Sequence, residues 1–166
     1  MIDLHMDPAI ASFGQLLGVN DRLLGKALAA VKAEDLTRRP GPGSNPLVWL
    51  VGHVVVSRNM LARVVGGGLE LSWAGLFGRK SRFDVGAVYP DKDELLRALG
   101  ELSAQLQVRL PALGEERLSA PGPGGLPAPD QTVRGAIAFL VYHEAYHVGQ
   151  VGYVVKWLGY PGIVDG

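Results

Sequence analysis

Apolar residues recur at helical spacing in four separate stretches of the chain. Within each stretch they return every three or four residues, which is typical of helices that bury one face. The stretches run from Asp7-Pro8 to Val31, from Ser44-Asn45-Pro46 to about Val65, from Asp91 to Leu106 and from about Thr132 to Leu158. At about 1.5 Å per residue their lengths fit a bundle. The sequence therefore predicts an all-α protein built as a four-helix bundle.

Local signals mark where these helices begin and end. Asp7-Pro8 and Asn45-Pro46 each place a capping residue before a proline, which is favoured at the first helical position. Asp91 with Glu94 has the form of a capping box. Gly159 is a stop signal after the fourth helix. Three large apolar residues within or at the ends of these helices are interpreted as core: Trp49, Met60 and Trp157.

The connections between the predicted helices are long. The stretch from Gly66 to Pro90 has no helical pattern, but its aromatic residues predict that it packs onto the bundle, namely Trp73, Phe77, Phe83 and Tyr89. Two other connections contain similar Pro-Gly runs, residues 40–43 and 121–124, and the residues before them also correspond at an offset of 82. Each half of the chain would then be a helix, a Pro/Gly loop and a helix. A duplication and a chance repetition both stay open.

Composition narrows the class of protein. The chain has 166 residues, of which 48% are hydrophobic, and 16 basic residues balance 16 acidic ones. This length predicts a single domain spanning residues 1–166, and the apolar share excludes a disordered chain. Zero net charge argues against a nucleic-acid partner, because phosphate contacts need clustered basic residues. Nothing at the N-terminus has the form of a signal peptide and no uncharged run is long enough to span a bilayer. We therefore expect a cytoplasmic protein with no membrane partner.

Three of the four histidines lie inside the apolar helical stretches. His143 and His147 are four residues apart and so share one helix face, while His53 has mostly apolar helical neighbours and is predicted to point at the core. A buried imidazole with unpaired nitrogens costs about 1–3 kcal/mol. One divalent ion would satisfy all three rings and keep an open position, as in catalytic sites. Since the chain has no cysteine, histidine is the expected ligand. Core histidines paired by hydrogen bonds are the alternative, and His5 is interpreted as a solvated terminal residue.

The pair of histidines also belongs to a second metal motif. His143-Glu144-Ala145-Tyr146-His147 matches the His-Glu-x-x-His pattern of zinc proteases, in which the glutamate activates a water. The chain after His147 has no further histidine to complete such a site. Glu144 lies about 100° around the helix from His143, so we expect it to point away from the metal into a salt bridge or solvent.

Two longer segments resemble the signatures of the DinB/YfiT-like family of metal-dependent enzymes. They are Asn45-Pro46-Leu47-x-Trp49-Leu50-x-Gly52-His53 and His143-Glu144-Ala145-Tyr146-His147-x-Gly149-Gln150. Tyr89-Pro90 and Leu158-Gly159 fit as well, so the resemblance covers essentially the whole chain. It implies a four-helix bundle in up-up-down-down order. It also implies a divalent metal ion, often nickel or zinc, held by His53, His143 and His147 with water completing the shell.

The resemblance further implies a class of reaction. Relatives include transferases and isomerases that use a low-molecular-weight thiol such as bacillithiol or mycothiol, whose sulfur is activated by the metal. We therefore expect a thiol-dependent S-transferase or hydrolase with a small-molecule substrate. Some isomerase relatives have a carboxylate where this chain has His143, which argues against direct transfer of the isomerase activity. A non-catalytic bundle in which the ion only joins two helices is the alternative, and a homodimer is left open.

Several polar residues near the predicted site each have two possible roles. Asn20 is expected to make a buried helix–helix hydrogen bond rather than to face the metal. For Gln150 we favour a role in helix packing over a hydrogen bond to a group near the metal. Arg79, Lys80 and Arg82 are interpreted as a solvated basic patch, with attraction of an anionic thiol as the alternative.

Overall fold

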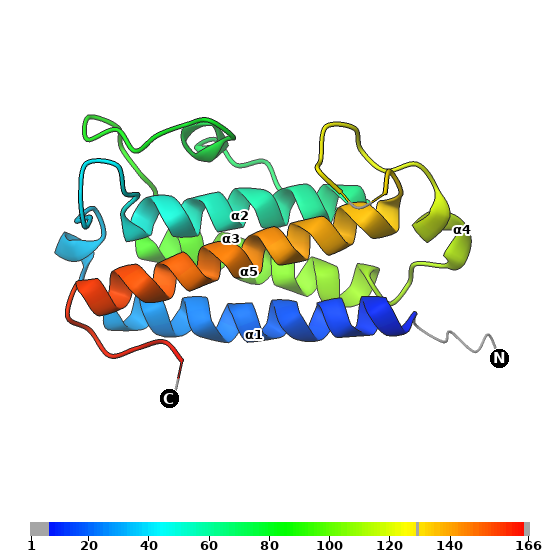
Figure 1. The fold of residues 1–166 in the computed structure, drawn as a ribbon, viewed down its shortest axis with the longest axis horizontal. Coiled ribbons are helices and arrows are strands. Elements are labelled where there is room, and N and C mark those ends of the chain that lie inside the picture. The colour runs from blue at the N-terminus through cyan, green and yellow to red at the C-terminus, as the bar shows by residue number, and fades with distance from the viewer. Residues whose placement is uncertain (1–6, 129, 165–166) are drawn as a thin grey trace.

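Four long helices form a bundle in the computed structural model, which describes residues 7–128 and 130–164 (Figure 1). The long helices are α1 (Pro8–Ala30), α2 (Leu47–Val64), α3 (Lys92–Arg109) and α5 (Val133–Trp157). Shorter elements are the 3-10 helices η1 (Ala33–Asp35) and η2 (Ala74–Phe77) and the short helix α4 (Glu115–Ser119). No strand occurs among these residues. The predicted all-α class is confirmed.

The helix ends follow the local signals with one exception. Asp7 Oδ1 accepts from the amides of Ala9 and Ile10, and Asp91 Oδ1 accepts from the Glu94 amide at 2.8 Å. The cap predicted at Ser44-Asn45 is wrong. Pro46 has extended backbone angles and directly precedes α2, so the helix begins at Leu47 without a side-chain cap.

Contacts at the two ends of the bundle show that α1 and α5 run parallel. At their first residues, Asp7 and Arg134 form an ion pair at 2.5 Å. At their other ends, the Lys32 amide donates to the Tyr160 hydroxyl at 3.2 Å. Both helices therefore cross the molecule in the same direction, as Figure 1 also shows.

Helices α2 and α3 run the opposite way. The Val48 amide, at the start of α2, donates to the Leu36 carbonyl just after α1, and Lys92, at the start of α3, donates to the Val31 carbonyl. The order is up-down-down-up, so the up-up-down-down order implied by the family resemblance is wrong. The physical reason lies in residues 65–91, which lead back along the bundle and make α2 and α3 parallel (Figure 1).

The four helices surround one hydrophobic core in the cyclic order α1, α5, α2, α3. The predicted seam of α3 points inward through Leu95, Leu99, Leu102 and Leu106. Trp49 is buried as predicted, but Met60 and Trp157 are 44% and 41% exposed, so their assignment to the core is wrong. Both lie near the ends of their helices, and the Arg38 guanidinium lies over the Trp157 ring, 5.8 Å from its centroid.

The connection from α2 to α3 packs onto the bundle through its aromatic residues. Phe77 is fully buried, and its ring contacts those of Trp73 and Tyr89 at centroid distances of 5.5 Å and 5.6 Å. Phe83 stacks on Tyr89 at 5.1 Å. The expectation that this stretch folds onto the helices is confirmed, and it places η2 against α2.

Within the described residues, α2 is the one helix long and apolar enough to cross a membrane, and most of it is buried inside the bundle.

The two halves of the chain are also similar in structure. The short elements η1 and α4 begin at Ala33 and Glu115, which are separated by the same offset as the sequence repeat. Each half of the chain is thus two long helices that run in opposite directions across the bundle, with a short helical turn between them.

Candidate metal centre

The structure brings the three predicted histidines together in the seam between α2 and α5. The Nε2 atom of His143 lies 3.2 Å from Nε2 of His147 and 3.5 Å from Nε2 of His53. One ligand atom from each of the three residues lies within 4.8 Å of the other two. The three rings are therefore positioned to bind a single metal ion.

The two separations from His143 match the needs of a tetrahedral ion. Two nitrogens that each lie about 2.0–2.1 Å from one tetrahedral Zn²⁺ are about 3.3 Å apart. The observed 3.2 Å and 3.5 Å fall on either side of that value. Three protein ligands of this kind leave a fourth position open, which distinguishes catalytic sites from closed structural ones.

Hydrogen bonds on the far side of two rings determine which nitrogen faces the shared space. His53 Nδ1 is 2.7 Å from the carbonyl oxygen of Phe77, and His147 Nδ1 is 2.8 Å from Oε1 of Gln150. Both oxygens accept, so each Nδ1 donates its proton and each Nε2 keeps a lone pair. Such outer contacts are the usual way in which proteins orient histidine ligands.

The surroundings of His143 also favour a bound cation. Its Nδ1 is buried and has no hydrogen-bond partner among the described residues, and its Nε2 faces the lone pairs of His53 and His147. A proton on His143 Nε2 can pair with one of those lone pairs and not with both. A cation can bind the Nε2 lone pairs of all three rings, and a donor set of three imidazoles suits a divalent transition metal.

The surroundings favour the neutral form of the His143 and His147 rings. Burial, and to a smaller extent the nearby His53, lower the pKa of His147 to about 4, although the hydrogen bond to Gln150 opposes this shift. Burial also lowers the pKa of His143. Since metal ions bind the neutral imidazole, these shifts keep the ligands ready at neutral pH.

Aromatic side chains form the inner wall of the site. Trp49 stacks almost parallel on His53, with centroids 5.0 Å apart, and Phe139 lies 5.7 Å from His143. Phe77 approaches α2 closely because residue 52 is a glycine, since a Cβ there would lie 2.2 Å from Phe77 Cε1. Gly52 therefore allows the η2 segment to bring its carbonyl to His53.

The outer side of the site is open to solvent. The Tyr146 ring lies 5.1 Å from that of His147, and its hydroxyl accepts from Gln150 Nε2 at 3.2 Å. Tyr146 is 55% exposed. Gln150 also lines a cleft of about 300 Å³ between α5 and residues 40–45, which Leu50 closes from α2. A small molecule in this cleft would lie beside the residue that holds His147.

Glu144 takes no part in the cluster, which contradicts the protease interpretation. Its carboxylate is 1% exposed and is bound by Arg58 at 2.5 Å and 2.8 Å. Asn20 Nδ2 also donates to it, at 2.9 Å. A carboxylate with these partners has no access to a water at the histidines. The predicted salt bridge of Glu144 and the predicted helix–helix hydrogen bond of Asn20 are both confirmed.

Three expectations remain. For Gln150 the structure favours the alternative to helix packing, because its amide oxygen binds a histidine of the cluster. Arg79, Lys80 and Arg82 are exposed, in agreement with a solvated patch. His5 lies outside the described residues.

Three contributors were not predicted from the sequence: the Phe77 carbonyl, the Tyr146 hydroxyl and Arg58. Only Arg58 carried a signal, because it is a lone charge in an apolar stretch and needs a buried partner.

Comparisons with known proteins agree with the helical fold. A family model described as the DinB superfamily matches residues 17–151. A solved structure titled "Crystal structure of the conserved protein of locus from Enterococcus faecalis" is similar, with a TM-score of 0.63. The two are 16% identical over 88% of this chain and 94% of that one, so the likeness supports the fold alone. No curated protein matches significantly.

Proposed function

The chain belongs to the DinB superfamily, and from this premise we propose that it is a metal-dependent enzyme. A divalent ion, zinc or nickel, is held by Nε2 of His53, His143 and His147. The bound ion would lower the pKa of a water or of a low-molecular-weight thiol, such as bacillithiol or mycothiol, and so supply a nucleophile. The reaction class is S-transfer or hydrolysis. The observation that carries the proposal is the position of the three histidines. Nε2 of His143 lies 3.2 Å and 3.5 Å from the other two Nε2 atoms, the three ligand atoms lie within 4.8 Å of one another, and hydrogen bonds behind the His53 and His147 rings hold their tautomers.

The residues of this chain would have distinct roles around the ion. The Phe77 carbonyl and the Gln150 amide oxygen hold the His53 and His147 rings in orientation. Trp49 and Phe139 exclude water from the inner side. The Tyr146 hydroxyl accepts a hydrogen bond from Gln150, so its own proton is available to a group on the solvent side of the site.

The substrate is proposed to be a small molecule that enters from the cleft beside Gln150. A cleft of about 300 Å³ is at the lower end of the range for ligand sites, about 300–1,000 Å³. A cytoplasmic location fits cellular thiols as cosubstrates. It also fits the burial of α2, the one described helix that is apolar enough to span a membrane.

Metal analysis of the purified protein tests the ligand assignment. We expect a single tightly held ion per chain in the wild type and in His5→Ala, which changes the fourth histidine of the chain. His53→Ala, His143→Ala and His147→Ala should each lose the ion or hold it far more weakly. Full occupancy and unchanged affinity in His53→Ala would contradict the three-ligand site.

A non-catalytic role, in which the ion only joins α2 to α5, is the second candidate, because the ligands come from these two helices. Cobalt substitution separates the two candidates. Adding a thiol to the Co²⁺ protein should produce a new thiolate-to-metal absorption band if a coordination position is open, and no change if the site is closed. A screen with bacillithiol, mycothiol and glutathione plus electrophiles then tests for turnover.

A further inference from the structure

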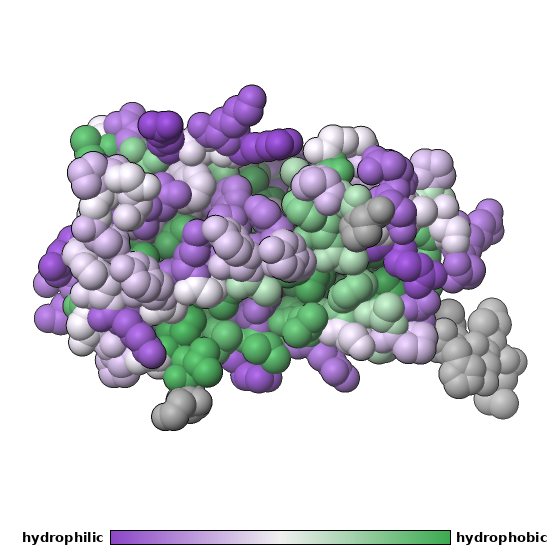
Figure 2. Space-filling view, in the orientation of Figure 1, coloured by the Kyte–Doolittle hydropathy of each residue, from purple (hydrophilic) through white to green (hydrophobic). Residues whose placement is uncertain are grey.

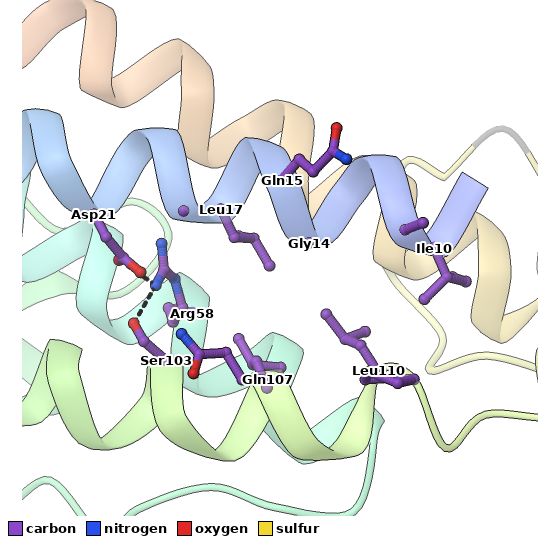
Figure 3. A pocket seen from close by; sticks show the side chains of 13 residues that line it. Ile10, Gly14, Gln15, Leu17, Asp21, Arg58, Ser103, Gln107 and Leu110 are labelled. Carbon is purple, nitrogen blue, oxygen red and sulfur yellow. Dashed lines mark hydrogen bonds and ion pairs between the residues drawn. The ribbon is translucent and has the colours of Figure 1, made fainter. Parts of the chain in front are cut away.

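A second cavity lies in the seam between α1 and α3, on the opposite side of the bundle from the histidines. The cyclic order of the helices places this seam across the core from the α2–α5 seam. The cavity measures about 330 Å³, and apolar side chains from both helices form its walls (Figure 3). The main ones are Ile10, Leu17, Leu106 and Leu110.

Missing side chains on α1 keep this cavity open. Gly14 and Gly18 both line it, and a Cβ built at either position meets no atom within 4 Å. Glycine weakens the interior of a helix relative to alanine. Two glycines therefore lie where larger residues would both stabilise α1 and fill the space.

The cavity ends at a polar cluster. Arg58 is fully buried, and its Nη1 donates to Asp21 Oδ1 and Ser103 Oγ, each at 2.6 Å (Figure 3). Its Nε and Nη2 bind Glu144. Four of the five guanidinium N–H groups are thus engaged. The Ser103 hydroxyl donates in turn to the Leu99 carbonyl.

The charges of this cluster do not balance. One guanidinium faces two carboxylates, which leaves one negative charge. Glu144 is 1% exposed, whereas the Asp21 side chain is 28% exposed and lines the cavity. The excess charge is therefore presented at Asp21, at the end of an apolar space.

We propose that this cavity binds a small molecule with an apolar body and a primary amine head. The body would lie between α1 and α3, and the ammonium group would bind the Asp21 carboxylate. An anionic head would be repelled, because the guanidinium is already matched by two carboxylates. The site is separate from the proposed metal-dependent activity and does not depend on it.

Binding of three matched probes to the metal-loaded, full-length protein tests the proposal. n-Octylamine, 1-octanol and octanoate have the same apolar chain and differ in the head group. Titration calorimetry should give the amine an affinity about tenfold higher than the alcohol, since hydrogen bonds to charged groups are the stronger ones. Octanoate should not bind measurably.

Variants locate the site. Gly14→Leu should abolish binding of amine and alcohol, whereas Gly25→Leu, also on α1 and also with open space at its Cβ, lies outside the cavity and should bind both as the wild type does. Asp21→Asn should remove the preference for the amine and leave octanol binding in place. Far-UV circular dichroism and thermal unfolding of each variant check that it is folded.

Several results would overturn the proposal. These are failure of the amine to bind at millimolar concentration, equal affinity for octanoate, or amine binding that survives Gly14→Leu. A concentration-dependent dimer that Gly14→Leu converts to a monomer would show instead that a second copy of the chain fills the cavity.

Discussion

The carboxylate of Glu144 and the guanidinium of Arg58 form a buried, two-point ion pair, at 2.5 Å and 2.8 Å, between α5 and α2. Glu144 directly follows His143 in the sequence, and Arg58 lies five residues after His53. Asn20 from α1 and Ser103 from α3 bind the same pair, so it connects all four long helices. The ion pair thereby fixes the register in which α2 and α5 present their histidines.

Glu144→Gln should destabilise the fold without removing the metal site. The substitution leaves the fully buried Arg58 paired with Asp21 alone, so the cost should be below the value of about 3–5 kcal/mol for a buried charge left without any partner. Urea unfolding measures the change. Glu116→Gln, on the exposed side of α4, is the control and should stay within about 0.5 kcal/mol of the wild type. A stable Glu144→Gln protein that has lost its metal would instead place Glu144 in the metal site.

Gln150→Leu should weaken metal binding more than it weakens the fold. His147 Nδ1 loses the oxygen that holds its tautomer and ring orientation. Changes to such outer partners reduce metal affinity about 10–100-fold. Competition with a chromophoric chelator gives the affinity. Gln150→Glu keeps an accepting oxygen and should remain near the wild-type affinity, and equal affinities for all three proteins would show that this hydrogen bond is without effect.

The fold was predictable because its signals are local. Asp7-Pro8, Asp91 and Gly159 act on adjacent backbone groups, and the spacing of Leu95 and Leu99 reflects the geometry of a single helix. The direction of each helix is a different matter. It depends on how residues 65–91 return along the bundle, and this follows from tertiary packing of Phe77 and Tyr89 rather than from a motif.

The sequence could predict only those parts of the candidate site that depend on the type of side chain. Three histidines in apolar helices have few other polar groups to pair with, so the sequence predicts that they lie close to one another. The carbonyl that orients His53 belongs to the backbone of Phe77, and any residue type would supply it. Glu144 lies next to a histidine of the cluster, but only the three-dimensional position of Arg58 shows why its side chain faces the other way.

The stability of the metal-free protein should fall on acidification through His147. Its pKa is lowered to about 4 in the folded state, from 6.5 in the unfolded chain, so the unfolded state binds more protons between these two values. The free energy of unfolding therefore decreases as the pH falls from about 6.5 to about 4. Denaturation in the presence of a chelator measures this, and an NMR titration gives the pKa directly. His147→Gln should show a weaker pH dependence, and a normal pKa at His147 would contradict the prediction.

Gly52→Ala should perturb the fold and the metal site together. Its Cβ would lie 2.2 Å from Cε1 and 2.3 Å from Cζ of the fully buried Phe77, so the Phe77 ring must move. Overpacking of this kind costs about 1–3 kcal/mol. Because the carbonyl of the same residue binds His53, metal affinity should fall as well. Gly14→Ala, where the added Cβ meets open space, should instead raise stability by about 0.5–1 kcal/mol and leave the metal unchanged. Metal affinity equal to the wild type in a destabilised Gly52→Ala protein would show that the His53 ring is held independently of Phe77.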